Sequence, residues 1–226
     1  MFKEKQINGK AVYYSDLIDV EHFFTSRDLV VKDNIDAIKD YLGVERLIRP
    51  GQTHSDNVEI VDECIDYNNV DALILNVPNT AIYLNFADCT PVILYDEVLN
   101  ISAIAHAGWR GTASKIVQKT AFKMFNELGS KPKNVSAVIG PCISFEEFET
   151  YEEAINLLKA SVKNHKGLFN GRYADLKGIN AEQLREIGIE KTDICPYCTV
   201  RDNDKFFSYR KENKTSQRHS AVIKIK

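Results

Sequence analysis

Residues 101–128 read ISAIAHAGWRGTASKIVQKTAFKMFNEL and combine a strand pattern, a glycine-rich turn and a helix pattern. The apolar run Ile101–Ala105 predicts a buried strand. From Thr112 to Leu128 apolar side chains recur at three- and four-residue steps, which predicts an amphipathic helix. The turn between them places a His, the only Trp and an Arg within residues 106–110. A packed core does not need that polarity, so we expect this turn to bind a ligand.

The flanking segments predict more strands than crossover helices, which favours the α+β class with mixed sheets. Asn8-Gly9 between two β-prone runs is typical of a hairpin. No internal repeat or low-complexity linker divides the chain, and we expect a single catalytic domain over residues 1–226. The predicted strands are Phe2–Ile7, Ala11–Leu17, Val58–Val61, Ala72–Asn76, Ala81–Phe86, Val92–Tyr95, Val135–Ile139, Phe206–Tyr209 and Ser220–Ile225, and the further predicted helices are Asn34–Leu42, Phe145–Val162 and Leu176–Ile187.

The composition is that of an ordinary globular protein, with 44% hydrophobic and 27% charged residues. No apolar run approaches the ~20 residues of a membrane span, and the mixed N-terminal stretch does not resemble a signal peptide. The net charge of −3 and the lack of a basic block argue against nucleic acid as a partner, and no membrane partner is expected. The charge runs EEFETYEE and KENK are interpreted as solvated faces. Five cysteines without a secretion signal predict reduced thiols and a cytoplasmic location.

Three potential metal ligands lie at predicted strand ends, where loops on rigid sheets gather functional groups. His54 precedes one strand, Cys89 lies between two strands, and His106 ends another. Thiolate and imidazole suit zinc, and three protein ligands with an open fourth position are typical of a catalytic site. Because 35 and then 17 residues separate the three positions, the spacing leaves a second interpretation open. In that interpretation Cys89 is a buried thiol, and both histidines are satisfied by backbone partners.

The other cysteines favour structural roles. Cys195 and Cys198 form CPYC, the active-site form of glutaredoxins, but a polar turn rather than a helix follows, which favours a structural pair. Cys142, in the turn VIGPCIS, is either a small buried hydrophobe or a nucleophile with His106 as its base. The remaining histidines are expected to pack or hydrogen-bond at His22 and to face solvent at His165 and His219.

Five motifs taken together resemble one family: QTHSDNV, ADCTPVILYD, AHAGWRGT, IGPCIS and CT…FFSYR. They stand in family order between His22 and Arg218, and the sequence strongly resembles the YfiH-like, or laccase-domain, family, called polyphenol oxidase in older usage. The resemblance implies a zinc site made by His54, Cys89 and His106, which copper is able to occupy in vitro. It implies phosphorolysis of adenosine, inosine, guanosine and methylthioadenosine, with deamination of adenosine, so purine nucleosides and phosphate are the expected partners. The implied fold is a layered α/β sandwich resembling that of the cytotoxic deamidase toxins.

Two departures from the family pattern affect this expectation. HFFTSRDLVV lacks the glycines of the usual N-terminal motif, although Arg27 still aligns with it. Near the end of the chain, Gln217-Arg218 replaces the usual Gly-Arg.

The catalytic hypothesis assigns roles to residues around the three ligands. Arg27 and Arg110 are expected to bind phosphate, because guanidinium groups bind oxyanions bidentately. Gly108 and Gly111 are expected to let the backbone approach the ligand closely. Asp88 is expected to protonate a purine nitrogen or to orient a ligand histidine. The structural alternatives are a salt bridge for the arginine beside Trp109, and packing beneath the turn for the Trp itself.

Other functions stay open at this point. A copper-dependent, laccase-like polyphenol oxidase needs many imidazole ligands, whereas the chain has five scattered histidines. A cysteine hydrolase would use Cys89 or Cys142 as its nucleophile. In a non-enzymatic role, or in that of a peptidoglycan-editing factor, zinc would only brace the fold.

Overall fold

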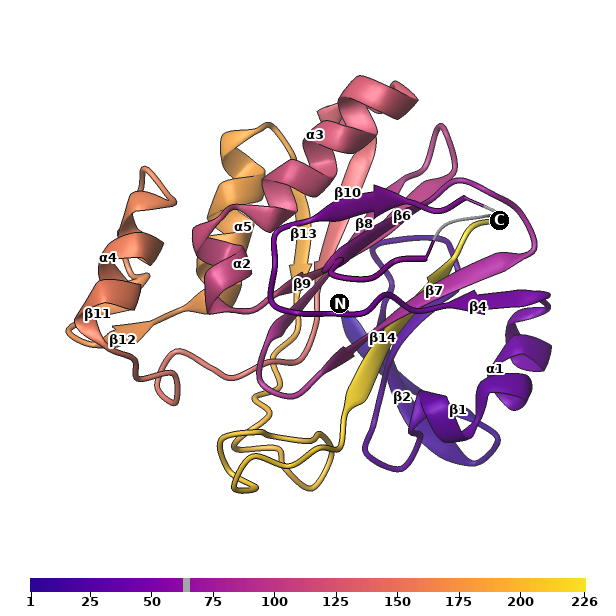
Figure 1. The fold of residues 1–226 in the computed structure, drawn as a ribbon, viewed down its shortest axis with the longest axis horizontal. Coiled ribbons are helices and arrows are strands. Elements are labelled where there is room, and N and C mark those ends of the chain that lie inside the picture. Colours follow the sequence, from indigo (N-terminus) through magenta and orange to yellow (C-terminus); the bar gives the residue numbers. More distant parts are fainter. Residues whose placement is uncertain (63–65) are drawn as a thin grey trace.

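Two six-stranded sheets pack face to face in the computed structural model, which describes residues 1–62 and 66–226 (Figure 1). The first sheet contains, in order across it, β1 (Phe2–Ile7), β2 (Lys10–Ser15), β3 (His22–Thr25), β14 (His219–Lys224), β7 (Thr80–Phe86) and β4 (Arg46–Ile48). The second sheet contains β13 (Lys191–Ile194), β10 (Val135–Ile139), β8 (Thr90–Asp96), β9 (Ile101–Ala107), β6 (Ala72–Leu75) and β5 (Val58–Ile60). Both sheets are mixed, because β4–β7, β5–β6 and β10–β13 are parallel pairs among antiparallel ones.

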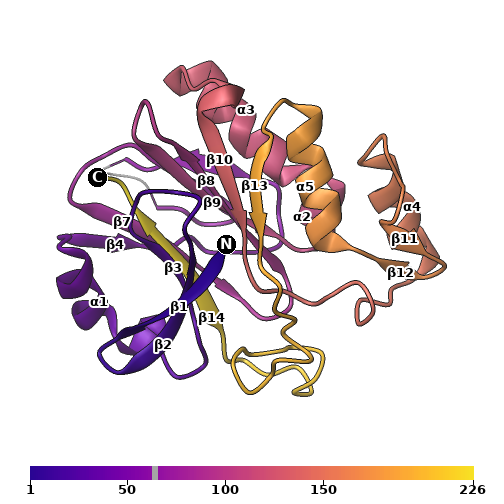
Figure 2. The ribbon, with the colours of Figure 1, turned by 180° about the vertical axis from the view of Figure 1, so that it is seen from behind.

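The helices cover the outer faces of the two sheets. The helical segments are η1 (Val31–Asp33), α1 (Ile35–Leu42), α2 (Trp109–Ala113), α3 (Ile116–Leu128), η2 (Pro132–Asn134), α4 (Glu152–Ala160) and α5 (Leu176–Glu186). A two-stranded sheet, β11 (Phe169–Asn170) and β12 (Tyr173–Ala174), lies near α4. Seen from behind, β13 runs beside β10 under α5 (Figure 2). None of the described helices is both long enough and apolar enough to cross a membrane.

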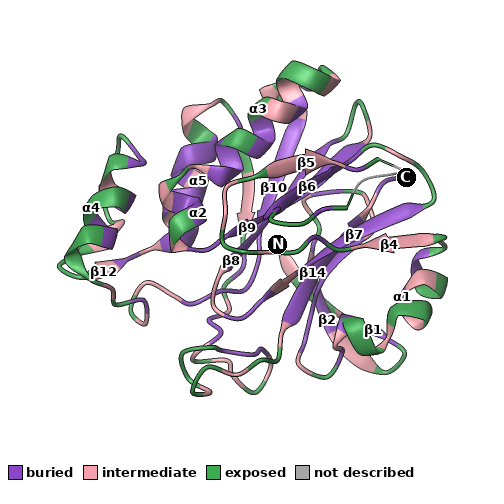
Figure 3. Cartoon of the chain, in the orientation of Figure 1, coloured by how far each residue is buried: buried purple, intermediate pink, exposed green. Residues whose placement is uncertain are grey.

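One hydrophobic core lies between the two sheets, where Phe24 and Leu84 of the first sheet meet Ile104 and Val138 of the second. A second cluster joins the outer face of the second sheet to α3 and α5, and a third joins the first sheet to α1. The inner strands of both sheets are accordingly buried along most of their length, the edge strands β1, β4, β5 and β13 are more exposed, and the helices keep exposed outer faces (Figure 3). The α+β class and the layered sandwich with mixed sheets are therefore confirmed, whereas the likeness to deamidase toxins stays a prediction.

Several predicted elements agree closely with the structure. Asn8 and Gly9 both have positive φ, 51° and 76°, as a tight two-residue hairpin turn requires. Gly43 ends α1 in the left-handed conformation, with φ of 64°. The strand Val135–Ile139 has the predicted bounds. Sequence analysis did not predict β3, β4, β11, β12 or β13.

The predicted helix from Thr112 to Leu128 is wrong at its start, because the structure breaks it into α2 and α3. Lys115, between them, has a left-handed φ of 60°. Gln183 Nε2 donates to the Thr112 carbonyl at 2.8 Å, the group that would accept from residue 116 in a continuous helix. Asn180 Nδ2 also donates to Thr112 Oγ1 at 3.0 Å. Contacts from α5 thus decide where α2 ends.

The predicted helix Phe145–Val162 is also wrong in its first half, since α4 begins only at Glu152. Thr150 N donates to the Arg172 carbonyl, and Glu149 forms a β-bridge with Tyr173, so the backbone there is extended.

The predicted strand Phe206–Tyr209 is a series of turns. Phe206 N donates to the Asp202 carbonyl, and Glu212 N donates to the Ser208 carbonyl. The prediction that His219 faces solvent is wrong as well: its exposed fraction is 0%, because β14 is a central strand flanked by β3 and β7.

Candidate active site

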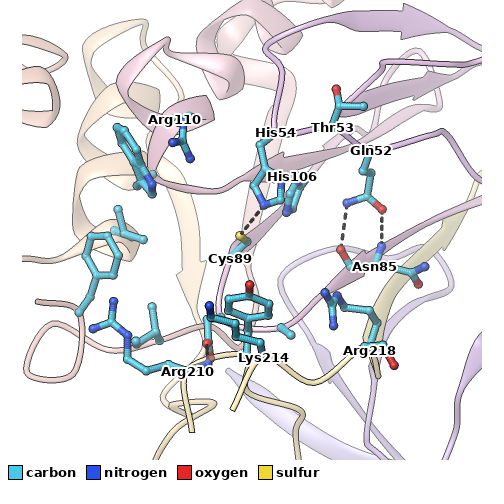
Figure 4. A pocket seen from close by; sticks show the side chains of 18 of the residues that line it. Gln52, Thr53, His54, Asn85, Cys89, His106, Arg110, Arg210, Lys214 and Arg218 are labelled. Carbon is cyan, nitrogen blue, oxygen red and sulfur yellow. Dashed lines mark hydrogen bonds between the residues drawn. The ribbon is translucent and has the colours of Figure 1, made fainter. Parts of the chain in front are cut away.

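Three ligand groups from distant parts of the chain meet where the two sheets join. Cys89 lies in the segment that crosses from β7 of the first sheet to β8 of the second, and His106 lies near the end of β9. His54 comes from the loop between β4 and β5. The ligand atoms of these residues lie within 4.8 Å of one another, and Cys89 Sγ is 3.7 Å from His54 Nε2 (Figure 4). This cluster is able to hold a metal ion.

Asp71 holds both histidine segments in place, and sequence analysis did not single it out. Its carboxylate is fully buried, and Oδ1 accepts from His106 Nδ1 at 2.7 Å. The same carboxylate accepts from the backbone N–H groups of Thr53, His54 and Ser55. An acidic residue directly before the apolar run of β6 was the only sequence signal, and it is a weak one. Because Nδ1 of His106 is occupied, Nε2 is left for a metal.

The buried groups of the cluster shift one another's pKa values. Burial alone would raise the pKa of Cys89, but the imidazoles of His106 and His54 outweigh it and lower this pKa to about 6. Burial alone would lower the pKa of His106, but Cys89 and Asp71 outweigh it and raise this pKa to about 9. The pKa of Asp71 lies below its usual value, because its hydrogen bonds from His106 and Ser55 overcome the cost of burial. The thiol is therefore prepared to act as a thiolate ligand.

The backbone around the cluster is shaped for close approach. A Cβ atom on Gly108 would lie 3.0 Å from Cys89 Sγ and 3.2 Å from His54 Cδ2, so the glycine makes room for two ligands. A Cβ on Gly111 would lie 3.1 Å from the His106 carbonyl oxygen. His54 itself has a left-handed φ of 62°, and Asp88, beside Cys89, has φ of 81°. Such strained positions in non-glycine residues are typical of functional sites.

The loop that carries His54 is also clamped to the first sheet. Gln52 Nε2 donates to the Asn85 carbonyl at 2.9 Å, and Asn85 N donates to Gln52 Oε1 at 2.8 Å (Figure 4). This pair of bonds fixes the loop that carries His54 against β7. The strand β7 ends at Phe86, three residues before Cys89.

A cavity of about 1020 Å³ opens onto the cluster and is lined by segments of both sheets. Trp109 forms part of its wall, with its ring edge-to-face against Tyr151 at 5.6 Å. Within the described lining there are six cationic side chains and one carboxylate, that of Asp88. The cationic residues are Lys32, Arg49, Arg110, Arg210, Lys214 and Arg218.

The structure separates the residues predicted to bind phosphate. Arg110 lines the cavity, and its guanidinium lies 4.3 Å from the Trp109 ring centroid; no carboxylate of residues 1–62 or 66–226 forms an ion pair with it. Arg27 lies outside the described lining, because Nη1 donates to the Asn203 carbonyl and Nη2 pairs with Glu212. Arg27 therefore braces the loop that follows CPYC.

Asp88 lines the cavity, and its expected role in protonating a purine nitrogen stays a prediction, but it does not orient His106. The hydrogen bond to His106 comes from Asp71, whereas Asp88 Oδ1 accepts from Thr199 Oγ1 at 2.6 Å and Oδ2 accepts from Arg210 N at 2.7 Å. Asp88 thus ties the C-terminal loop to the ligand segment.

That loop supplies three cationic cavity residues that sequence analysis did not assign: Arg210, Lys214 and Arg218. Lys214 belongs to the run KENK, which was interpreted as a solvated face. The motif FFSYR, which ends at Arg210, was the available signal.

Cys142, Cys195 and Cys198 are buried and lie outside the described cavity lining. Cys142, Cys195 and Cys198 are free thiols, and Cys64 lies outside the described residues. Burial raises the pKa of Cys142 and of Cys195 to about 12, which makes both poor nucleophiles at neutral pH. His22 packs in the interior as expected, where Ser15 N donates to its Nε2 at 3.1 Å, and His165 is exposed as expected.

The fold and the site together define a two-sheet α+β protein with a candidate His-Cys-His metal centre beside a cationic cavity. A family model described as multi-copper polyphenol oxidoreductase laccase matches residues 18–226. The chain belongs to this family, which confirms the resemblance to YfiH-like, laccase-domain proteins.

Two relatives and one solved structure are similar to this chain. It is 33% identical to a purine nucleoside phosphorylase of Clostridium acetobutylicum, over 84% of this chain and 82% of the relative. It is 30% identical to the adenosine deaminase RL5 of an unknown prokaryotic organism, over 91% of this chain and 85% of the relative. The crystal structure of the Bacillus licheniformis protein YfiH has a TM-score of 0.88 and 24% identity, with 98% of each chain covered. The last likeness concerns the fold alone.

Proposed function

We propose that this protein is a zinc-dependent purine nucleoside phosphorylase that also deaminates adenosine. The observation that carries the proposal is a three-ligand cluster that faces a large cavity whose charged lining residues are mainly cations. The names of the relatives, purine nucleoside phosphorylase and adenosine deaminase, support the same reaction classes. Adenosine, inosine, guanosine and methylthioadenosine are the substrates that we propose, with residues 1–226 acting as one catalytic domain in the cytoplasm.

The ligand set suits zinc. One thiolate and two imidazoles are typical zinc ligands, and the separation of their atoms, at most 4.8 Å, allows one ion to bind all three. The hydrogen bond from His106 Nδ1 to Asp71 matches the outer-shell support that metal-bound histidines usually have. When bound, zinc would supply a Lewis acid with one open coordination position toward the cavity.

The chain's own residues bind and orient the substrates in this proposal. Arg110 and Arg210 hold phosphate oxygens, because guanidinium groups form short, charge-assisted hydrogen bonds to oxyanions. Arg210 is oriented for this by the Glu147 and Glu149 carbonyls, which accept from its Nη1 and Nη2 at 2.7 and 3.1 Å. Trp109 offers an aromatic wall for a purine base.

A multi-copper oxidase mechanism fits the histidines poorly. Of the five histidines in the chain, His54 and His106 converge at the cluster. His22 is buried against the backbone of β2, His165 is exposed, and His219 is buried in β14. Copper bound in place of zinc at the one cluster remains compatible with the ligand set.

A second candidate function is a cysteine hydrolase, and one observation favours it. Cys89, His106 and Asp71 form a chain of nucleophile, base and orienting carboxylate, as in cysteine hydrolases. In this function a metal-free protein is active, and alkylation of Cys89 abolishes the activity. Metal-dependent turnover that returns on addition of zinc would contradict it.

The test measures zinc content and the products formed from adenosine, with and without phosphate. We expect adenine and ribose 1-phosphate when phosphate is present, and inosine with ammonia when it is absent. His106→Ala should lose zinc and both activities, whereas His165→Ala, at the exposed histidine, should keep them. A zinc-loaded wild-type protein that forms none of these products would overturn the proposal.

A further inference from the structure

The charge of the cavity exceeds what a nucleoside and one phosphate require. The whole chain is acidic, with a net charge of −3, yet six cations and one carboxylate occupy the described cavity lining. Phosphate carries about −1.5 to −2 charge at neutral pH, and an unmodified nucleoside carries none. The cationic character is thus concentrated at this site instead of reflecting the overall composition.

Five of the six cations fall into two groups by the elements that carry them, and Lys214, in the C-terminal loop, belongs to neither group. Figure 4 shows Arg110 and Arg210 on one side of Cys89 and Arg218 on the other. Arg110 comes from α2 above the second sheet, and Arg210 is held by the loop that precedes α4. We call Arg110 and Arg210 the helix-side cations; they are the pair proposed above to bind free phosphate.

The other group, the sheet-side cations, comes from segments next to the first sheet and consists of Lys32, Arg49 and Arg218. Lys32 lies in η1, Arg49 directly follows β4, and Arg218 directly precedes β14. No carboxylate of residues 1–62 or 66–226 forms an ion pair with any of the three. Arg218 is nevertheless oriented, because its Nη1 donates to the Thr215 and Gln217 carbonyls, each at 2.7 Å. Three cations without acidic partners in one cavity wall are suited to an anionic ligand.

The cavity has room for two anionic groups. Its volume of about 1020 Å³ is at the upper end of typical ligand pockets, ~300–1,000 Å³. A phosphate ester at the 5′ position of a nucleoside is several bonds from the glycosidic carbon, so it needs a subsite separate from that of the attacking phosphate. The two groups of cations provide such a separation.

We propose that the sheet-side cations form a second anion subsite, which binds a phosphomonoester carried by the substrate. The substrate class is then a purine nucleoside 5′-monophosphate, and this assignment of a reaction rests on the phosphorylase function proposed above. In the reaction with AMP, the C1′–N9 bond breaks and a bond forms between C1′ and an oxygen of phosphate. The base leaves with the bonding electrons and takes the proton that phosphate loses, which yields adenine and ribose 1,5-bisphosphate.

Calorimetric titration of the zinc-loaded protein tests the subsite independently of catalysis. With inorganic phosphate saturating, we expect AMP to bind at least about tenfold more tightly than adenosine, since charge-assisted hydrogen bonds of this kind support such a ratio. Ribose 5-phosphate should compete with AMP, and higher ionic strength should weaken AMP binding more than adenosine binding.

Matched variants locate the subsite. Arg49→Gln and Arg218→Gln should each reduce the ratio of AMP to adenosine affinity about fivefold or more. Arg46→Gln, three residues earlier on β4 and outside the described cavity lining, should leave that ratio within twofold of the wild-type value. Thermal unfolding of each variant confirms that it is folded.

The outcomes separate this proposal from the phosphorylase proposal. An AMP affinity no greater than that of adenosine, a ratio unchanged in both cavity variants, or an AMP advantage that saturating phosphate abolishes would each overturn the subsite. If AMP binds as expected but neither AMP nor adenosine reacts, the subsite stands and the phosphorylase function fails. If adenosine reacts but AMP binds no more tightly than adenosine, the phosphorylase function stands and the subsite fails.

Discussion

Two buried histidines lie near the ring of Phe86, and their surroundings shift their pKa values in opposite directions. The His106 ring is 5.3 Å from that of Phe86, and the His219 ring is 6.4 Å from it. His106 contacts a carboxylate and a thiol, and its pKa rises to about 9. Burial lowers the pKa of His219 to about 3, and the Pro141 carbonyl offsets this only in part. The two imidazoles are equally buried, so their neighbours decide the difference between them. His106 is a candidate metal ligand, and His219 is an uncharged core residue.

Removing the imidazole of His106 and that of His219 in turn tests whether the two residues have different roles. His106→Ala should lower phosphorolysis by more than ~100-fold, because loss of a ligand exceeds the effect of losing an outer-shell partner. His219→Ala should lower the free energy of unfolding by leaving a cavity between Phe86 and Phe206, while zinc content stays near stoichiometric. Zinc analysis and chemical denaturation distinguish the two. Loss of zinc from His219→Ala would contradict the comparison.

The carboxylate beside His106 gives a second prediction. Asp71→Asn should weaken zinc binding by roughly 10–100-fold, because it removes the charge that fixes the His106 ring and the Thr53–Ser55 backbone. Competition with a zinc-binding dye measures the affinity. Asp88→Asn is the matched control: Asp88 accepts from Thr199 and Arg210 instead, so zinc affinity should change little. Equal losses in both variants would show that Asp71 has no special role.

The reactivity of the thiols provides a further test, because the pKa of Cys89 is lowered whereas the pKa values of Cys142 and Cys195 are raised. In protein treated with a chelator, alkylation of Cys89 should rise with pH through a midpoint near 6, since its lowered pKa makes it a thiolate at neutral pH. Its rate at pH 7 should exceed that of Cys142 and Cys195 by roughly tenfold or more, because burial holds their pKa values near 12. Mass spectrometry of the labelled peptides measures this, and added zinc should protect Cys89. Preferential labelling of Cys195 would contradict the prediction.

The smallest expected effect concerns acid stability. His219 stays neutral in the folded protein down to about pH 3, whereas in the unfolded chain it binds a proton below about 6.5. The unfolded state therefore takes up more protons in this window, and stability falls as pH falls, by at most about 1.4 kcal/mol per pH unit from this residue. His219→Phe should make the free energy of unfolding less dependent on pH between 6 and 4. An identical slope in wild type and variant would refute the contribution of His219.

Much of the fold was predictable because its signals are local. The hairpin at Asn8-Gly9, the buried strands of the second sheet and the end of α1 at Gly43 depend on turn residues and apolar runs that neighbouring positions supply. The errors came where distant contacts decide the backbone. Gln183 takes the Thr112 carbonyl and ends α2, and Tyr173 pairs with Glu149 where a helix was expected.

The residues of the candidate site likewise differ in whether a local sequence signal identified them or distant contacts decided their role. Residue type at strand ends made His54, Cys89 and His106 candidate ligands, and the resemblance to the family favoured them over a structural interpretation. Asp71 gave no comparable signal, since a single acidic residue before a strand is common. Arg27 and Arg110 were indistinguishable in sequence as phosphate ligands, and the partners Asn203 and Glu212 draw only the first away from the cavity.

The sequence by itself determined the elements and the chemistry available: apolar runs that form strands, glycines that allow turns, and a thiol with two imidazoles as ligands. Only the tertiary structure decided which of these groups meet and what charge each carries. The crossing of the chain between the sheets at Cys89 brings the ligands within 4.8 Å, and it leaves His219 in a strand interior. The physical reason is that a side chain's chemistry is local, whereas its desolvation and its partners depend on residues tens of positions away.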